Sequence, residues 1–352
     1  DDPGRGNVRG GHSRHRRWHS RKAGPKRSEA EPQKNDDEPG KATVMTISHS
    51  PSRAALVDAH VHLYDSRVIR YGIVERRDQV FEALVGDYSK LPRSYLLDDY
   101  LRATRSRKVE GIVWHEFISD DALKEMAWAG KLAAASDVPM ALVGLVDLAD
   151  PDLPHRLDVY QAIPNLTAIR QHMGWDVHNP LRRMTSRPDF MTDPAWLRGL
   201  DSLNGQNLRC GLEVFAPQLP QLLAVVRAYP NIAFTIAVMG WPTDLGPDGY
   251  TRWRALMNDL GRCENTCVSI SAIECIFGLN WTEKQVEPWV MSIVEAFGPT
   301  RCMFGSHLPI DALSYGFDRL YDAYERIVAA FSEDERDAIF RRTALNWFRV
   351  PT

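Results

Sequence analysis

Two histidines separated by a single residue, His60 and His62, are the part of this sequence that most clearly suggests chemistry. They lie in the segment 56–63, LVDAHVHL, whose apolar flanks predict a buried strand. Side chains at alternate positions of a strand share a face, so Asp58, His60 and His62 are expected to point the same way. Two neutral imidazoles so placed can bind a divalent metal, and buried imidazoles need hydrogen-bond partners or a cavity. The pair therefore predicts a functional site that begins on this strand.

The elements that would position such a site alternate along the chain. Short apolar segments predict further strands at 111–114, 140–146, 166–170, 211–215, 232–238, 267–271 and 302–305. Helical spacing of apolar residues occurs at 121–135, 194–203, 218–228, 250–260, 283–297 and 317–330. Eight strands alternating with helices over about 300 residues favour an α/β fold of the (β/α)8 TIM-barrel type spanning 53–352. The alternative is an open doubly wound sheet, but no glycine-rich phosphate-binding sequence follows the first strand.

Composition limits the range of partners. With 352 residues, 44% hydrophobic content and ten tryptophans, the chain can form a large core. The net charge of −3 argues against nucleic acid or a membrane as partner, which leaves a small-molecule substrate and a homo-oligomer as expectations. No apolar run reaches the roughly 18 residues of a membrane span. An odd number of cysteines in apolar surroundings predicts reduced core thiols and a cytoplasmic location; they are Cys210, Cys263, Cys267, Cys275 and Cys302.

The first 52 residues differ in composition from the rest. They are rich in Gly, Pro, Ser, Arg and Lys and nearly devoid of aliphatic residues, which predicts a disordered tail. The basic stretch 15–22 is interpreted as part of this solvated tail rather than as a nucleic-acid patch. The chain begins with Asp, and Met45 is a candidate initiator; residues 1–44 would then be an extension. Mass spectrometry of the native amino terminus would decide this.

Ionisable residues follow several of the predicted strands. In a parallel barrel the carboxyl ends of all strands meet at one mouth, so these residues are expected to converge on one pocket. They are Glu116, Arg170, His172, Glu213, Glu274, His307 and Asp311.

Each of these residues also has a structural interpretation. The Arg170 guanidinium suits a substrate carboxylate, but it could instead balance Glu116 or Asp147 inside the barrel. His172 could be a capped loop histidine and Asp311 a helix cap, and Glu274 is interpreted as a loop charge.

Four tryptophans lie at or just after predicted strands: Trp114, Trp175, Trp241 and Trp281. Indoles at the mouth of a barrel would form a pocket for a flat or ring-containing ligand. Together with Arg170 and His172, they predict an aromatic or polycyclic acid or lactone as substrate. Arg170, His172 and Trp175 are the predicted substrate-binding residues.

Three segments carry a resemblance to a known family. The segments VDAHVH at 57–62, AIRQ at 168–171 and CMFGSHLPID at 302–311 resemble the amidohydrolase-related family of metal-dependent hydrolases. That family includes lactonases and decarboxylases of the aminocarboxymuconate semialdehyde type, all on the eightfold barrel. The similarity extends over about 54–350, and the stretches 143–154 and 215–220 resemble the lactonase branch. The resemblance implies a barrel enzyme that acts on a polarised carbonyl.

Two positions depart from the family pattern. Members with a metal usually add a histidine on the fifth or sixth strand and an aspartate that ends the eighth. Here Val238 stands in place of the histidine and His307 in place of the aspartate.

Three hypotheses accommodate these departures. In the first, a divalent metal, zinc if any, is held by His60, His62 and His307, and Glu213 either ligates it or acts on the bound water. In the second, the site is metal-independent: His60 and His62 polarise a carbonyl while Glu116, Glu213 or Asp311 serves as catalytic base. In the third, the chemistry is lost or redirected.

These hypotheses lead to one preferred function and two alternatives. The preferred function is a hydrolase in which water attacks a lactone or ester carbonyl of a carboxylated, ring-containing small molecule. The first alternative is a lyase that decarboxylates or dehydrates an aromatic or polycyclic acid. The second is a catalytically degenerate barrel that acts as a binding or accessory protein.

Overall fold

The computed structural model describes residues 54–352. The predicted disordered tail at 1–52, with its basic stretch and Met45, lies outside the described residues. Of the described helices, none is long and apolar enough to cross a membrane. All five cysteines are free thiols, and every one except the partly exposed Cys263 is buried, as expected for core thiols.

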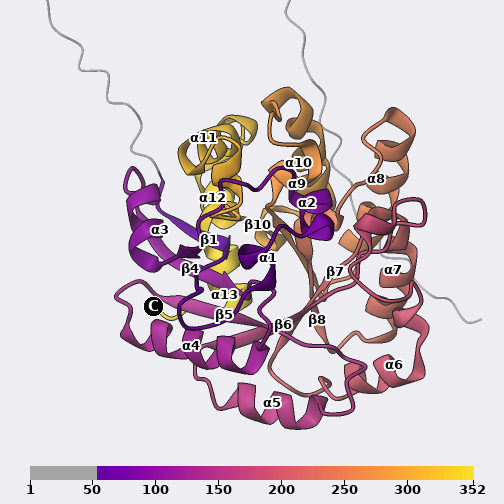
Figure 1. Cartoon of the computed structure of the whole chain (residues 1–352). Helices are drawn as coiled ribbons and strands as arrows, with labels where there is room; N and C mark the ends of the chain where they lie inside the picture. Colours follow the sequence, from indigo (N-terminus) through magenta and orange to yellow (C-terminus); the bar gives the residue numbers. More distant parts are fainter. Residues whose placement is uncertain (1–53) are drawn as a thin grey trace, which may run out of the picture. The chain divides into compact units, whose positions relative to one another are not determined.

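Eight parallel strands form the central sheet, and each pairs with the strand of this sheet that follows it in the sequence (Figure 1). Their bounds are β1 Leu56–Val61, β4 Val109–His115, β5 Met140–Leu145, β6 Leu166–His172, β7 Arg209–Glu213, β8 Ala233–Ile236, β9 Thr266–Ile270 and β10 Cys302–Phe304. Each falls within or overlaps a segment predicted from its apolar residues. The run of β-branched and other apolar residues in these strands suits a sheet that is covered on both faces.

The first and last strands meet and close the sheet. Val61 and Leu308 form a parallel bridge, His62 N–H donates to the Leu308 carbonyl at 2.8 Å, and His307 N–H donates to the His60 carbonyl at 2.7 Å. Gly305 allows this approach, since a Cβ atom there would lie only 2.6 Å from the Cβ of His60. The predicted (β/α)8 barrel is thus confirmed, and the open doubly wound sheet is excluded.

Helices surround the barrel between successive strands (Figure 1). The helices that were predicted are α4 Ala122–Ala135, α6 Pro194–Asp201, α7 Leu219–Ala228, α8 Pro247–Gly261, α10 Glu283–Phe297 and α11 Phe317–Ile327. Further helices, which were not predicted, include α3 Leu97–Thr104, α5 Leu153–Gln161, α9 Ile273–Phe277, α12 Glu333–Asp337 and α13 Thr343–Phe348. Small side chains of the strands, such as Val57 and Ala59, pack with Phe348 and Val350 of the carboxyl-terminal segment into a separate apolar cluster.

A long excursion separates β1 from β4. The short strands β2 Tyr64–Asp65 and β3 Ser94–Tyr95 pair antiparallel and close its base. Between them, the excursion carries the helices α1 Gly72–Glu75 and α2 Gln79–Val85. Helix α2 lies against α9 and against the short turn at Pro180–Arg182, both of which follow the carboxyl ends of barrel strands. The excursion therefore reaches over the barrel mouth.

The expected alternation along β1 is broken at its centre. The pairing of β1 with β4 shifts register between Asp58 and Val61. Asp58 accepts hydrogen bonds from Tyr100 Oη of α3 at 3.1 Å and from Ser306 N–H at 2.7 Å, so it faces the helix layer. The prediction that Asp58 shares a face with His60 and His62 is therefore wrong, because the irregularity changes which face of the sheet the side chains after it point to.

The packing at the seam between β1 and β10 can be tested with Gly305→Ala. We expect this variant to lose about 1–3 kcal/mol of unfolding free energy, the usual effect of overpacking a core. Urea denaturation followed by circular dichroism measures the loss. Gly72→Ala is the matched control, because the nearest atom to a Cβ there is an Asp120 carboxylate oxygen at 3.3 Å. Equal stability of the two variants would contradict the tight seam.

Candidate active site

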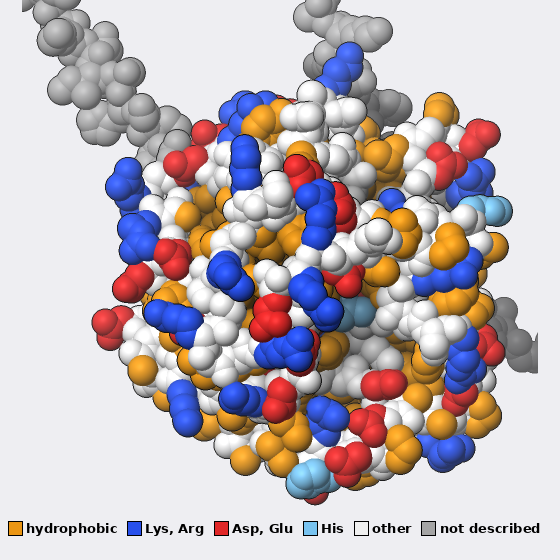
Figure 2. Space-filling model, in the orientation of Figure 1, with side chains coloured by type: hydrophobic (Ala, Val, Ile, Leu, Met, Phe, Trp, Pro, Cys, Tyr) orange, Lys and Arg blue, Asp and Glu red, His pale blue; other side chains and the backbone are white. Residues whose placement is uncertain are grey.

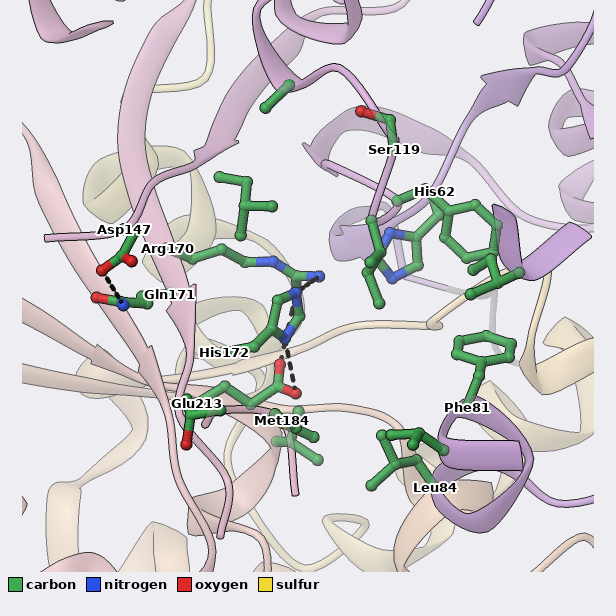
Figure 3. Close-up of a pocket in the computed structure, with 18 of the residues that line it drawn as sticks. His62, Phe81, Leu84, Ser119, Asp147, Arg170, Gln171, His172, Met184 and Glu213 are labelled. Carbon is green, nitrogen blue, oxygen red and sulfur yellow. Dashed lines mark hydrogen bonds and ion pairs between the residues drawn. The ribbon is translucent and has the colours of Figure 1, made fainter. Parts of the chain in front are cut away.

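One cavity of about 720 Å³ opens at the carboxyl ends of the barrel strands. Its walls include five of the predicted site residues: His307, and the four labelled in Figure 3, which are His62, Arg170, His172 and Glu213. Figure 2 shows the same face as a surface, with a hollow near its middle and charged side chains around it. The structure therefore brings residues from both ends of the barrel sequence to one place, as the expected convergence requires.

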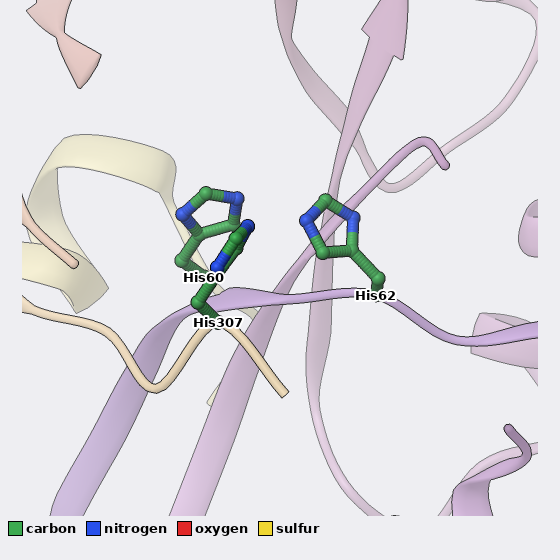
Figure 4. Close-up of side chains that lie close together, drawn as sticks. All are labelled: His60, His62 and His307. Carbon is green, nitrogen blue, oxygen red and sulfur yellow. The ribbon is translucent and has the colours of Figure 1, made fainter. Parts of the chain in front are cut away.

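Three histidine rings form a compact cluster (Figure 4), and two of them, those of His62 and His307, line the cavity. The ring centroids of His60 and His62 are 4.8 Å apart, those of His60 and His307 4.7 Å, and those of His62 and His307 5.1 Å. One ring nitrogen from each lies within 4.8 Å of the others. The predicted set of three imidazoles is thus assembled from β1 and from the turn after β10.

In each of the three rings, the Nδ1 atom has its own partner. His62 Nδ1 lies 2.9 Å from the Glu116 carbonyl oxygen, His60 Nδ1 lies 2.8 Å from Ser271 Oγ, and His307 Nδ1 pairs with the Glu274 carboxylate. A carbonyl oxygen only accepts, so Nδ1 of the neutral His62 carries the proton and its Nε2 keeps a lone pair, while Nδ1 of His307 is the nitrogen that faces Glu274. Such outer partners fix the ring orientation of metal-binding histidines.

Burial keeps two of these rings uncharged. It lowers the pKa of His60 and of His62 well below the usual value, and the neighbouring histidines and Arg170 lower both further. Arg170 Nη1 lies 3.5 Å from His60 Nε2, which therefore acts as the acceptor of that contact. His60 and His62 are thus neutral imidazoles, the form that binds metals or polarises a carbonyl.

A fourth histidine, His115, belongs to the same group and was missed. Its ring centroid lies 4.2 Å from that of His60, its Nε2 lies 3.2 Å from the Ala59 carbonyl, and its Nδ1 lies 3.4 Å from Arg170 Nη1. The signal was available, because His115 ends β4 directly before Glu116.

Next to the histidines, two cations and two carboxylates form an ionic quartet of Glu116, Arg170, His172 and Glu213. Arg170 Nε donates to Glu116 Oε1 at 2.5 Å. His172 lies between the two acids, with Nε2 2.8 Å from Glu116 Oε1 and Nδ1 3.1 Å from Glu213 Oε1. All four side chains are largely buried, with exposed fractions of 15% or less. The quartet is electrically balanced when both acids are ionised and His172 is protonated.

The electrostatics of the quartet favour that charged state. Burial by itself would lower the pKa of His172, but the charges of Glu213 and Glu116 outweigh it and raise the pKa to about 9. Burial would likewise raise the pKa of both acids. The positive charges of Arg170 and His172 outweigh this effect of burial. They hold the pKa of Glu116 well below its usual value and lower the pKa of Glu213. His172 is therefore an imidazolium at neutral pH.

Arg170 is paired inside the barrel. Its charge is balanced by Glu116, as the structural interpretation of Arg170 in the sequence analysis allowed. Asp147, the other partner considered there, instead accepts a hydrogen bond from Gln171 Nε2 at 2.8 Å. Glu116 itself does not line the cavity, because it sits behind Arg170 and His172. Of the acids predicted as catalytic, Glu213 is the one that lines the cavity.

Two acids lie behind the cavity wall. Glu274 is 1% exposed and pairs with His307, so its interpretation as a loop charge is wrong. Asp311 is fully buried, and neither of its carboxylate oxygens has a hydrogen-bond partner among the described residues. Burial and the nearby Glu274 raise the pKa of Asp311 well above its usual value. Asp311 does not line the cavity and makes no side-chain cap hydrogen bond.

The tryptophans do not form the expected aromatic mouth. Trp241 lines the cavity. Trp114 is fully buried and donates Nε1–H to the Leu63 carbonyl at 2.9 Å, and Trp281 packs against Tyr315. The Arg183 guanidinium lies over the Trp175 ring, with its central carbon 4.5 Å from the ring centroid. Trp175 is not part of the cavity wall.

Several site residues have a left-handed backbone. Val238, Met239, Ala272 and His307 all have φ between 48° and 63°, which is unfavourable for side chains with a Cβ atom. Three of them, Val238, Ala272 and His307, line the cavity. Such strain is common at functional sites, where the surrounding structure holds it in place.

The fold and the site together define a TIM-barrel protein with histidines and an acid–base group at the mouth. The chain belongs to the amidohydrolase family, whose model, described as "Amidohydrolase", matches residues 57–350. The resemblance seen in the sequence is thereby confirmed.

Individual relatives are more distant. The chain is 28% identical over 301 residues to an uncharacterised protein, y4mH, of Sinorhizobium fredii, covering 85% of this chain and all of that protein. It is 25% identical to an L-fucono-1,5-lactonase of Burkholderia ambifaria, covering 62% of this chain and 73% of the lactonase. A zinc-bound amidohydrolase structure from Burkholderia multivorans aligns with TM-score 0.70 at 22% identity, covering 85% of this chain and all of that one.

The charge of His172 makes stability depend on pH. Its folded pKa of about 9 exceeds the usual 6.5, so its stabilising effect is fully present below pH 6.5 and is lost as pH rises through 9. We expect wild type to exceed His172→Gln by roughly 1–3 kcal/mol of unfolding free energy at pH 6, with the gap shrinking toward pH 10. Urea denaturation at both pH values measures the gap. A gap that does not change with pH would contradict an imidazolium at this position.

Proposed function

We propose that this chain is a hydrolase that adds water to the carbonyl of a lactone or ester. The observation that carries the proposal is the adjacency of two groups at one cavity: the cluster of His60, His62 and His307, and the His172–Glu213 acid–base pair. The first can polarise a carbonyl, and the second can move protons beside it. The lactonase names of the Burkholderia relatives support a cyclic ester as the substrate.

The three imidazoles fit a divalent metal, zinc by preference. His62 and His307 each use Nδ1 to contact an outer partner, which leaves Nε2 of both rings for a ligand, and His60 accepts at Nε2. A zinc held by His60, His62 and His307 would supply a polarised carbonyl and a water of lowered pKa. The Arg170 contact with His60 would have to yield for such binding, and its charge is already balanced by Glu116.

The proton transfers are assigned to residues of the quartet. Glu213, an ionised carboxylate on the cavity wall, accepts a proton from the attacking water as the new carbon–oxygen bond forms. His172, the imidazolium beside it, gives its proton to the alkoxide oxygen when the acyl carbon–oxygen bond breaks. The products are a carboxylic acid and an alcohol, joined in one hydroxy acid if the substrate is a lactone. Arg170 keeps Glu116 ionised, which in turn holds His172 in place.

Elemental analysis tests the metal assignment without an activity assay. We expect about one zinc per chain in protein purified without chelators, and a loss of most of it in His62→Ala and His307→Ala. His155→Ala, an exposed histidine of α5, is the matched control and should keep its zinc. Metal-free protein that still hydrolyses lactones would favour the metal-independent mode in place of the zinc site.

A substrate panel with Glu213→Gln tests the reaction. Wild type should release acid from one or more lactones or esters in a pH-stat, and Glu213→Gln should lower kcat by about 10²–10⁴ because a proton acceptor is lost. Glu110→Gln, outside the cavity, is the control and should leave kcat unchanged. Release of carbon dioxide from aromatic acids, with no lactone or ester hydrolysed, would replace the proposal with the decarboxylase alternative.

A further inference from the structure

The walls of the cavity differ in chemistry from one side to the other (Figure 3). On one side lie the ionisable side chains Arg170, His172 and Glu213, from the ends of β6 and β7. On the other side lies helix α2, whose Phe81 and Leu84 face the cavity in Figure 3. The hydrocarbon side chains that α2 contributes to the cavity, here called the α2 wall, are Val80, Phe81, Leu84 and Val85.

The sequence of α2 explains why one face is apolar. Asp78 caps its first turn by accepting a hydrogen bond from Phe81 N–H at 2.8 Å, and Gly86 ends it with a φ of 84°. Phe81, Leu84 and Val85 are spaced three and four residues apart, so they share one helix face. None of the three is more than 8% exposed.

Two sets of contacts hold the excursion that carries the α2 wall, one at its base and one beside the helix. The strands β2 and β3 close the base, and Tyr64 Oη donates to the Pro92 carbonyl there. Nearer the helix, the Tyr88 ring packs edge-on against Phe81 at 4.9 Å, and Tyr88 Oη contacts the Asp78 backbone nitrogen. These contacts hold the apolar wall in a fixed position opposite the acid–base pair.

We propose that the substrate carries an alkyl or aryl group that lies against the α2 wall, and that polyhydroxylated sugar lactones are poor substrates. This inference rests on the proposed lactone or ester hydrolysis. The four side chains of the wall have no polar atom, so a hydroxyl group placed there would lose its hydrogen bonds to water without replacement. A methylene group placed there gains from leaving water. The positive charges of Arg170 and His172 already balance the negative charges of Glu116 and Glu213. The ionisable side of the cavity therefore needs no charged group on the substrate.

A homologous series of δ-lactones tests this preference. We expect kcat/KM to rise up to about fourfold for each methylene added to a 6-alkyl substituent until the wall is covered, the change that burial of a methylene implies. Sugar 1,5-lactones of similar size should react at least 100-fold more slowly than the best alkyl lactone. If kcat/KM does not change with alkyl length and sugar lactones react faster than alkyl lactones, the inference is overturned, while lactone hydrolysis itself still stands.

Polar substitution of the wall provides the mutational test. Leu84→Asn, nearly isosteric, should remove most of the chain-length dependence of kcat/KM. Leu101→Asn, on the outer surface of α3 and 39% exposed, is the matched control and should retain the full dependence. Should Leu84→Asn fail to fold, Val80→Thr repeats the test at a more exposed position of the same wall. An unchanged chain-length dependence in the folded variant would overturn the inference.

Binding of unreactive analogues separates this inference from the proposed reaction. Alkyl-substituted δ-lactams keep the ring and carbonyl but resist hydrolysis, and calorimetry measures their affinity directly. If wild type hydrolyses no lactone but its lactam affinity rises with alkyl length and Leu84→Asn abolishes the rise, the α2 wall assignment stands and the proposed function fails. Lactam affinity that does not depend on alkyl length overturns the α2 wall assignment whatever the reaction.

Discussion

The seam where β10 returns to β1 is the constraint on which the site depends. Two backbone hydrogen bonds, from His307 to the His60 carbonyl and from His62 to the Leu308 carbonyl, both close the barrel and set the spacing of the histidines. The rings are therefore positioned by the geometry of barrel closure rather than by a flexible loop. The close approach at Gly305 and the left-handed backbone of His307 are the local adjustments that this closure requires.

A second property of the site is that its charges are balanced within it. Isolated buried charges are costly, and a buried ion pair is tolerated only when its remaining polar atoms also find partners. Arg170, His172, Glu116 and Glu213 satisfy one another, and Arg170 further contacts His60 and His115. Removing one member would leave an unpaired charge in the barrel, so these residues act as a unit in both stability and chemistry.

Periodicity predicted most of the fold, because each barrel strand is a short apolar run between helices. Among other helices it missed α5, which has Pro154 in its first turn and little separation of apolar from polar faces, and α2, which has only seven residues. Within the site, chain order predicted that His60, His62 and His307 would meet. It could not reveal that Asp58 turns to α3, that Glu274 is buried behind His307, or that Trp114 points away from the cavity. Those outcomes depend on a register shift and on side-chain packing, which local sequence patterns do not encode.

The excursion between β1 and β4 leaves the barrel and returns to it through the two-residue ladder of β2 and β3. It supplies α2 to one side of the cavity, while the histidines and the ionic quartet come from the barrel strands and the turns that follow them. Changes of sequence within α2 would therefore alter which molecules the cavity accepts without replacing a residue of the reactive centre.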